Sequence, residues 1–377
     1  MRHLIRLFAV IAATATALLG APAVLANADE GDGSQHAVFV QTNDPNGNSI
    51  AAYARNRNGT LTFLATYATG GKGGRAAGAV VDPLATQGAL VFDREHRLLL
   101  APNAGSNTVS VFSVRGTRLH LNQIVGSGGP FPASIAVHED IAYVLDAGLA
   151  GSVQGYRIAG RRLHPIAGSQ RSLGLANTNP PGFLQSPGQV GFSPDGSKLV
   201  ITLKGNAGGA VDVFNVSDDG QLSTAPTATA VGGVAFAFVF DSEGRLVIVN
   251  AAFGNVSTFN VNSNGSLFLV SAGASSGQLG ACWVAEADGN FYTGNTGSAN
   301  LSQFAIDDNG TVALRNPQAA TGVSGAIDMA VSGHFLYAQS GASGSVKAFA
   351  VSEDGSLRAI DTWTVPNGSS QEGIAAS

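Results

Sequence analysis

The sequence predicts an all-β protein, a single seven-bladed β-propeller with four strands per blade. The first observation is a unit of three short strands, joined by a Gly/Asn loop and a tight turn, that recurs seven times. The second is its spacing, because four-strand units at a period of about 40–50 residues are typical of propellers. The third is the final stretch, Ser369 to Ser377, which matches the first strand of a repeat.

The N-terminal residues have the features of an export signal. Arg2 and Arg6 precede an apolar stretch, and a small-residue cleavage site ends at Ala28. The mature protein is then secreted, periplasmic or at the cell surface, with no stable membrane span after cleavage. An uncleaved membrane anchor is the alternative. The expected segments are a signal peptide at 1–28, a short linker at 29–36 and the propeller at 37–377.

Each repeat has a glycine in the tight turn between its third and fourth strands. Asn-Gly and Asp-Gly suit such hairpins because both residues tolerate positive φ. The two widest spacings come from insertions at residues 67–87 and 166–187, which should lie with the Gly/Asn loops on one face. The opposite face, made of short turns, is expected to be structural. The turn glycines are Gly59, Gly116, Gly160, Gly220, Gly265, Gly310 and Gly355, so successive turns are 57, 44, 60, 45, 45 and 45 residues apart.

The two ends of the chain are expected to share one blade. The first repeat begins at its second strand, near Ala37, and the C-terminal sequence GIAAS supplies the missing first strand. Such closure leaves no sheet edges facing each other across a gap in the ring.

The first strand of each repeat alternates between bulky residues and small or polar ones. Period-2 alternation places the bulky set between neighbouring sheets and the other set toward the central channel. Cys282 has no His beside it, so we expect a packing residue, and as the only cysteine it forms no internal disulfide. The channel set is Ala89, Ser134, Gln189, Ala237, Cys282, Asp328 and Gly373.

A polar residue ends the second strand of every blade and faces the loop-rich rim. Asn in this place caps the Gly-rich loop that follows by bonding nearby backbone groups. Lys204 breaks the pattern, because an ammonium group cannot accept hydrogen bonds, and it either binds an anion or is a solvated loop charge. The ring comprises Asn43, Asn103, Asp146, Lys204, Asn250, Asn295 and Ser340.

Charge and composition limit the partners. The formal net charge is −5 and no basic cluster occurs, which argues against nucleic acid. We expect a monomer that binds a small molecule or lactone and needs no cofactor.

The stretch GFSPDGSKLVITLKG, from Gly191 to Gly205, resembles the central blade of the seven-bladed lactonase family, and the resemblance extends over residues 37–377. That family includes phosphogluconolactonase and the carboxymuconate-cyclising enzymes. Members carry a His–Pro–His-like stretch before the central strand, where this chain has LQSPGQV. A His-based mechanism therefore does not carry over. By our strand assignment, the mature histidines lie at short turns or on outer strands.

The resemblance implies an exported lactonase-like protein that hydrolyses or binds a small anionic sugar lactone at the loop-rich end of the channel. The sequence leaves catalysis itself open. Arg75, Arg171 and Lys204 are the candidate anion contacts. Asp328 is the candidate catalytic residue, with Asp146 and Glu372 as further groups that could act on water. Gln189 lines the path to Asp328.

Two other functions stay open. One is a non-catalytic binding or scaffold propeller outside the cell, which the missing His and the low charge favour. The other is a calcium-dependent lactonase, because oxygen donors are the ligands that Ca²⁺ prefers. The donors available for it are Asn103, Asn250, Asn295, Asp146 and Asp328.

Overall fold

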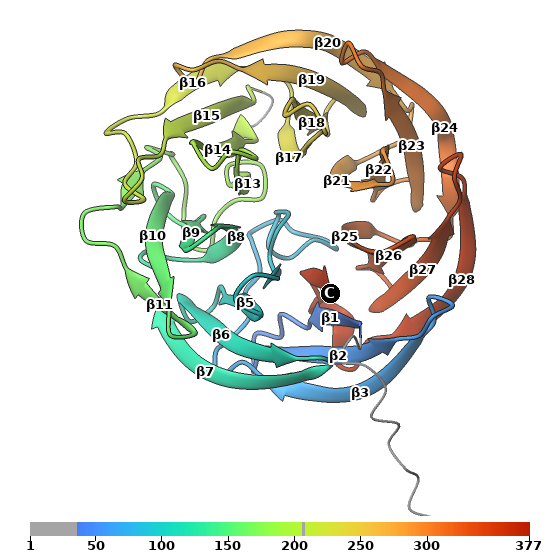
Figure 1. The fold of residues 1–377 in the computed structure, drawn as a ribbon, viewed down its shortest axis with the longest axis horizontal. Coiled ribbons are helices and arrows are strands. Elements are labelled where there is room, and N and C mark those ends of the chain that lie inside the picture. The colour runs from blue at the N-terminus through green and yellow to red at the C-terminus, as the bar shows by residue number, and fades with distance from the viewer. Residues whose placement is uncertain (1–35, 206–207) are drawn as a thin grey trace, which may run out of the picture. The chain divides into compact units, whose positions relative to one another are not determined.

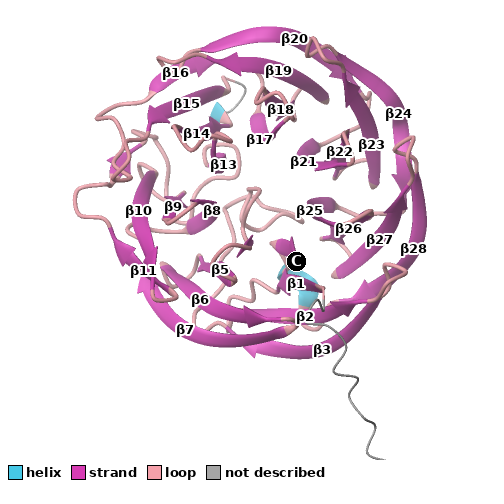
Figure 2. Ribbon diagram, viewed as in Figure 1, coloured by secondary structure: helices cyan, strands magenta, loops and turns pink. Residues whose placement is uncertain are grey.

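The protein is described by a computed structural model that covers residues 36–205 and 208–377. The predicted signal peptide and almost all of the linker lie outside the described residues and stay predictions. The described chain is a ring of seven antiparallel sheets, as predicted, with no α-helix; a short 3-10 helix, Gly368–Ser370, precedes the last strand (Figure 2). Among these residues, no helix is long and apolar enough to cross a membrane.

The blades follow one another around the ring in sequence order (Figure 1). In each blade the strands run from the channel outward in chain order, except that blade 1 begins with the C-terminal strand. Blade 1 contains β29 (Ile374–Ala376), β1 (Ala37–Gln41), β2 (Ser49–Arg55) and β3 (Leu61–Ala68). Blade 2 contains β4 (Val91–Asp93), β5 (Leu98–Asn103), β6 (Thr108–Arg115) and β7 (Arg118–Gly126). Blade 3 contains β8 (Pro132–His138), β9 (Ile141–Asp146), β10 (Ser152–Ala159) and β11 (Arg162–Pro165), with the short β12 (Arg171–Ser172) also paired to β10.

The remaining four blades repeat the same plan without an extra strand. Blade 4 contains β13 (Pro187–Phe192), β14 (Lys198–Leu203), β15 (Ala210–Asn215) and β16 (Thr227–Ala230). Blade 5 contains β17 (Ala235–Phe240), β18 (Leu246–Asn250), β19 (Asn255–Val261) and β20 (Leu267–Ser275). Blade 6 contains β21 (Ala281–Ala287), β22 (Asn290–Asn295), β23 (Asn300–Ile306) and β24 (Val312–Thr321). Blade 7 contains β25 (Ala326–Ser332), β26 (Phe335–Ser340), β27 (Ser345–Val351) and β28 (Leu357–Thr364).

The ring closes through the C-terminal strand, as the sequence predicts. Strand β29 pairs antiparallel with β1, with Phe39 opposite Ala375. Further bonds extend the junction, because the amide of Gln41 donates to the carbonyl of Gly373 at 2.9 Å. Blade 1 therefore needs both ends of the described chain.

The core consists of apolar layers between neighbouring blades. The bulky residues of the innermost strands lie in these layers, with Trp283 packed between blades 5 and 6 at only 1% exposure. Tyrosines of the second strands add a polar link to the next blade. Tyr143, Tyr292 and Tyr337 each donate from the hydroxyl to the carbonyl of the turn glycine in the following blade.

The innermost strands depart from simple alternation. Five of them, in blades 3 to 7, carry a register shift near their first residues, and the shift leaves Cys282 and Asp328 without a partner on the second strand. Such bulges re-aim side chains at the rim of a closed sheet. The period-2 prediction therefore places the packing residues correctly but misses this local irregularity.

Candidate functional site

The insertion between β3 and β4 extends to the ring axis and fills the loop-rich end of the channel. In Figure 1 it is the pale blue loop at the centre of the ring. Residues 82–87, which we call the plug, are all buried. Leu84 and Ala85 of the plug pack against apolar side chains of blades 2 and 3, including Phe131. The loop-rich end of the channel, where the sequence predicts the ligand, is therefore occupied by the chain's own plug.

Hydrogen bonds to several blades hold the plug. The Gln87 amide and the Thr86 hydroxyl donate to the carbonyl of Gly188, which begins blade 4. The indole of Trp283 in blade 6 donates to the Thr86 carbonyl at 3.1 Å. From blade 3, the hydroxyl of Ser134 donates to the Gln87 carbonyl at 2.7 Å. These partners come from distant parts of the sequence, so only the closed ring brings them together.

Three ionisable side chains are buried close together around the plug, and we call Asp82, which belongs to the plug, Lys204 and Glu372 the ionic centre. The Glu372 carboxylate accepts the amide of Leu84 at 2.5 Å and that of Thr86 at 3.4 Å. Asp82 accepts the Ala85 amide at 2.7 Å. The Lys204 ammonium donates to the Ala85 carbonyl. All three side chains are at most 2% exposed.

Burial dominates the electrostatics of the ionic centre. It lowers the pKa of Lys204 to about 8, although the charges of Asp82, Cys282 and Glu372 oppose the shift. The ammonium also lies 5.0 Å and 4.8 Å from the ring centroids of Phe183 and Phe236, where the aromatic faces favour a cation.

The two acids of the ionic centre have raised pKa values. Burial raises the pKa of Glu372 well above its ordinary value, and the neighbouring charge of Asp82 raises it further. Burial likewise raises the pKa of Asp82, although the hydrogen bond to Glu372 opposes this. Two carboxyl groups in one buried site cannot both ionise cheaply, so the pair retains a proton to higher pH than isolated acids would.

Asp328 lies in the same region of the channel. It occupies the β-bulge of β25 with a φ of 30°, and its carboxylate accepts the amides of Met329 and Ile374 at 2.9 and 3.4 Å. Burial raises its pKa to about 7, with a small contribution from the charge of Asp82. Cys282 is also buried, which raises the pKa of its thiol and keeps it protonated. The cysteine is therefore a packing residue, as the sequence suggested, with no activated thiolate.

The structure brings Lys204, Glu372 and Asp328 into one region but separates the two arginines from it. Arg171 uses Nε, Nη1 and Nη2 on backbone carbonyls, including those of Leu222 and Ser223 in blade 4. Its guanidinium therefore joins two blades. Arg75 is exposed and donates through Nη1 to the carbonyls of Ala79 and Val80 in its own insertion.

The candidate asparagines stabilise the loops that follow their strands. Asn103 bonds four neighbouring side chains, Asn250 bonds the amide of Val234 and the carbonyl of Gly232, and Asn295 bonds three side chains of blade 6. These amides are occupied within the loops. Among the described residues, no group of three or more His, Cys, Asp or Glu is placed to hold a metal ion. Calcium dependence stays an untested alternative.

Two further candidates lie elsewhere. Gln189 accepts the amide of Phe238 at 2.8 Å and so ties the innermost strands of blades 4 and 5 together. Asp146 is fully buried at the end of β9, and neither of its oxygens has a hydrogen-bond partner among the described residues. Burial raises the pKa of Asp146 well above its ordinary value.

Sequence analysis missed Asp82. A usable signal was present, because Asp82 is the only acidic residue in the 67–87 insertion. The described histidines give no replacement for the family's His stretch. His96 and His334 lie at turns between first and second strands, and His120 and His164 lie on the outer strands β7 and β11, as predicted. His138 is instead the last residue of the innermost strand β8, and His36 directly precedes β1.

Comparison with known proteins identifies the fold of this chain but no family. The chain matches no protein-family model and no curated protein sequence. Among solved structures, the periplasmic gluconolactonase of Pseudomonas aeruginosa superposes with a TM-score of 0.70 and 19% identity, covering 91% of this chain and 99% of that one.

Two further solved structures agree. A proposed 6-phosphogluconolactonase of Bacteroides uniformis gives a TM-score of 0.68 at 17% identity, covering 92% of this chain and 100% of its own. One of Bacteroides fragilis gives 0.66 at 16% identity, covering 91% and 98%. At such low identity the likeness speaks for architecture alone. The chain therefore has the fold of the gluconolactonase-like seven-bladed propellers.

Proposed function

We propose that the protein hydrolyses a small anionic sugar lactone at the ionic centre beneath the plug. The observation that carries the proposal is the group of buried ionisable side chains with shifted pKa values on the ring axis. Such groups are costly to bury and cluster at functional sites. The gluconolactonase-like fold supports the same reaction class by analogy.

Each group of the centre has a chemical role in this proposal. Lys204, which now holds the carbonyl of Ala85, would hold the lactone carbonyl and stabilise the negative charge that develops there. The ionised carboxylate of the Asp82–Glu372 pair would take a proton from water as its oxygen attacks that carbonyl. The ring C–O bond then breaks, and the released alkoxide oxygen recovers the proton. A hydroxy acid results, and the enzyme returns to its starting state.

Substrate entry requires Leu84, Ala85 and Thr86 of the plug to withdraw, while Asp82 at its start stays beside Glu372. The substrate would replace the contacts that Leu84, Ala85 and Thr86 make with Glu372 and Lys204. Arg75, at the exposed end of the same insertion, keeps Nε and Nη2 for an anionic group of the substrate. We assign Arg171 no such role, since its Nε and Nη2 bond carbonyls of blade 4 and its Nη1 bonds the carbonyls of Gly168 and Gln170 in its own insertion.

A second function is favoured by the plug itself. If the plug never withdraws, the ionic centre has only the structural role of holding the plug in place. The protein is then a binding or scaffold propeller that acts through its outer surface. Plug residues that are buried without exception favour this second function.

The test is hydrolysis of gluconolactone and phosphogluconolactone by the mature protein. The reaction is measured as the acid released at constant pH. The variants are Glu372→Gln, Lys204→Gln and Asp328→Asn, with Glu243→Gln on an exposed turn as the matched control. We expect about a 100-fold or greater loss for the first two and none for the control. Circular dichroism separates loss of folding from loss of chemistry.

The alternatives have distinct outcomes. A parent protein that hydrolyses no lactone overturns the proposal and leaves the binding propeller. Hydrolysis that persists in Glu372→Gln and Lys204→Gln places the chemistry elsewhere. Hydrolysis that EDTA abolishes and Ca²⁺ restores identifies the calcium-dependent lactonase.

A further inference from the structure

The face made of short turns carries charge in a segregated pattern. The turn between the third and fourth strands, which we call the outer turn, is basic in blades 1, 2 and 3 and contains no acidic residue there. All of these arginines are exposed except Arg55, which is half-buried over the Phe335 ring. The basic set is Arg55, Arg57, Arg115, Arg118, Arg161 and Arg162.

The outer turns of the other blades carry the opposite charge. Blades 4, 6 and 7 each have two exposed acidic residues in this turn and no basic one, and the turn of blade 5 is uncharged. None of the charges in either set forms a side-chain ion pair within the described residues. The acidic set is Asp218, Asp219, Asp307, Asp308, Glu353 and Asp354.

The blade order turns this sequence pattern into two halves of one face. Blades 1 to 3 are consecutive around the ring, as are blades 4 to 7 (Figure 1). Contacts between neighbouring turns support one shared face, since Arg245 between the first two strands of blade 5 bonds the outer turn of blade 6. The outer turns therefore give the turn face a basic half and an acidic half. The turns between first and second strands of blades 2 and 3 add the exposed Glu95, Glu139 and Asp140 to the basic half, together with Arg94 and Arg97.

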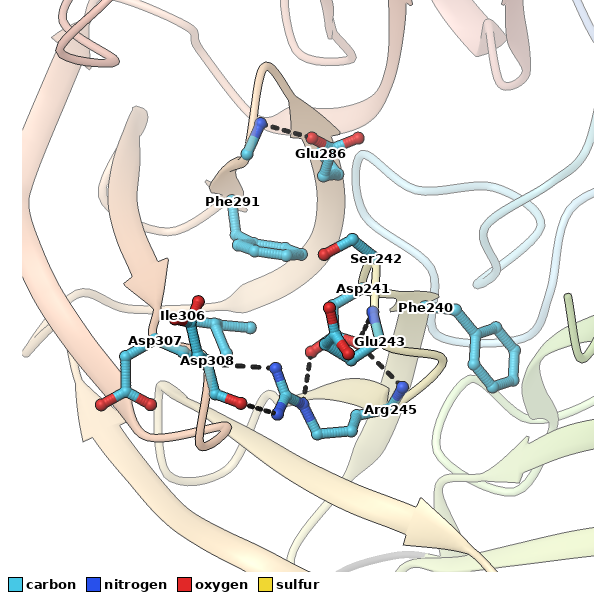
Figure 3. A pocket seen from close by; sticks show the side chains of 11 residues that line it. Phe240, Asp241, Ser242, Glu243, Arg245, Glu286, Phe291, Ile306, Asp307 and Asp308 are labelled. Atoms are coloured by element: carbon cyan, nitrogen blue, oxygen red, sulfur yellow. Dashed lines mark hydrogen bonds and ion pairs between the residues drawn. The ribbon is translucent and has the colours of Figure 1, made fainter.

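A cavity of about 350 Å³ opens in the acidic half, between blades 5 and 6. Its lining includes the ring of Phe291 and five acidic side chains against one arginine, whereas the ring of Phe240 points away from the others (Figure 3). That arginine, Arg245, is already engaged with Asp241 at 2.7 Å and with two backbone carbonyls. A cavity with an aromatic ring in its wall and surplus negative charge suits a guanidinium group, which stacks on rings and bonds carboxylates.

We propose that the turn face binds a second copy of this chain, basic half against acidic half, with an arginine of one copy in the cavity of the other. A two-fold axis in the interface, between blades 3 and 4 and through blade 7, places the basic outer turns of blades 1 and 3 over the acidic ones of blades 6 and 4. The basic turn of blade 2 then lies over the uncharged turn of blade 5, and the acidic turn of blade 7 lies at the axis beside its own copy. Such an interface is isologous and closes as a dimer. The complementarity of the two halves selects this occupant over a partner of uniform charge, which would be repelled by one half.

The proposal is independent of the lactone site, which lies at the opposite, loop-rich end of the channel, and it revises the expectation of a monomer. Exposed ion pairs each contribute only about 0.2–1 kcal/mol and are screened by salt. The dimer is therefore weak and sensitive to ionic strength. It brings two copies together with both plugs facing outward.

Sedimentation equilibrium tests the dimer with the mature protein at about 20 mM and about 500 mM salt, on either side of effective screening. One variant carries Arg57→Glu, Arg118→Glu and Arg161→Glu, and the other carries Asp218→Lys, Asp307→Lys and Asp354→Lys. We expect the parent to dimerise at low salt and dissociate at high salt. Each variant alone should be monomeric, and an equimolar mixture should form a heterodimer.

The matched control is a variant with a charge reversal of the same size away from the turns, Lys72→Glu, Arg315→Glu and Lys347→Glu. This variant should dimerise like the parent.

Four results overturn the proposal. They are a parent that stays monomeric at low salt, a dimer that survives about 500 mM salt, a mixture of the two variants that fails to associate, and open-ended assemblies in place of a closed dimer.

Discussion

At the scale of single residues, position in the repeat does not decide a side chain's role. Asn103, Asp146 and Lys204 end the second strands of successive blades, yet the structure gives them different environments. Asn103 is fully hydrogen-bonded, Asp146 is buried with no hydrogen-bond partner in the part of the chain that the structure describes, and Lys204 lies between two aromatic rings beneath the plug. The three residues occupy equivalent backbone positions in their repeats. The neighbouring loops, which differ between blades, determine the contacts of each side chain.

Removing the Lys204 charge should destabilise the protein strongly. Lys204→Met keeps the apolar bulk but leaves the carboxyl groups of Asp82 and Glu372 buried without their cation. Breaking a buried ionic group in this way costs about 3–5 kcal/mol. Urea denaturation measures the loss, with Lys198→Met at the other end of β14 as the control. A loss below about 1 kcal/mol would show that the cluster is not an electrostatic unit.

Asp146 should make stability depend on pH. Its folded pKa lies above its unfolded one, so the folded state binds more protons, and the protonated carboxyl is the form that the fold accommodates. Stability is then full below the unfolded pKa, near 4, and is lost as pH rises toward the folded pKa.

Asp146→Asn removes this penalty, and other blades already place Asn here. We expect the variant to be more stable than the parent by about 1–3 kcal/mol at pH 7 and nearly equal to it at pH 4. Thermal unfolding at both values measures the difference. An equal gain at the two pH values would assign it to packing instead of ionisation.

At the scale of elements, the blades are joined by bonds that reach from a second strand to the next blade's outer turn. Tyr143, Tyr292 and Tyr337 make this bond, and Thr258 makes it from the third strand of blade 5 to Gly310. Burial raises the pKa of Tyr143 to about 12, so the hydroxyl remains a donor at any ordinary pH. These bonds fix the orientation of neighbouring sheets relative to each other, because apolar packing alone is not directional.

Losing one inter-blade bond should have a measurable cost. Tyr292→Phe leaves the Gly355 carbonyl without its 2.7 Å donor in a buried place. We expect a loss of about 1–3 kcal/mol in the free energy of unfolding. Tyr67→Phe is the control, because its hydroxyl has no bond among the described residues. Equal effects for the two substitutions would count against the bond.

At the scale of the whole molecule, one strand both closes the ring and positions one acid of the ionic centre. Glu372 lies two residues before β29, so the pairing of β29 with β1 places its carboxylate at the plug. The turn face and the plug lie at opposite ends of the channel. Closure, the ionic centre and the bipolar turn face are therefore properties of the complete ring and of no single blade.

Deleting Gln371 to Ser377 should lower stability by several kcal/mol. The deletion exposes the edge of β1 and the apolar surface covered by Ile374 and Ala375, at about 25 cal/mol per Å². It also removes Glu372, so Glu372→Gln serves as the matched control. The deletion should cost about 3 kcal/mol more than this substitution. Equal melting temperatures for the two would mean that β29 contributes nothing beyond its acidic neighbour.

The sequence by itself determined the architecture. Seven turn glycines, the apolar pattern of strands such as β5 and β14, and the GIAAS match predict the blades and their closure, because strand patterns and hairpin turns are local properties. Asp82, the burial of Lys204 and the use of Arg171 on carbonyls of blade 4 were decided only by the tertiary structure. The plug has no strand period, and its bonds to Gly188, Trp283 and Glu372 join residues about 100 to 290 positions apart. Such contacts depend on where the closed ring places an irregular segment, and no local pattern encodes that.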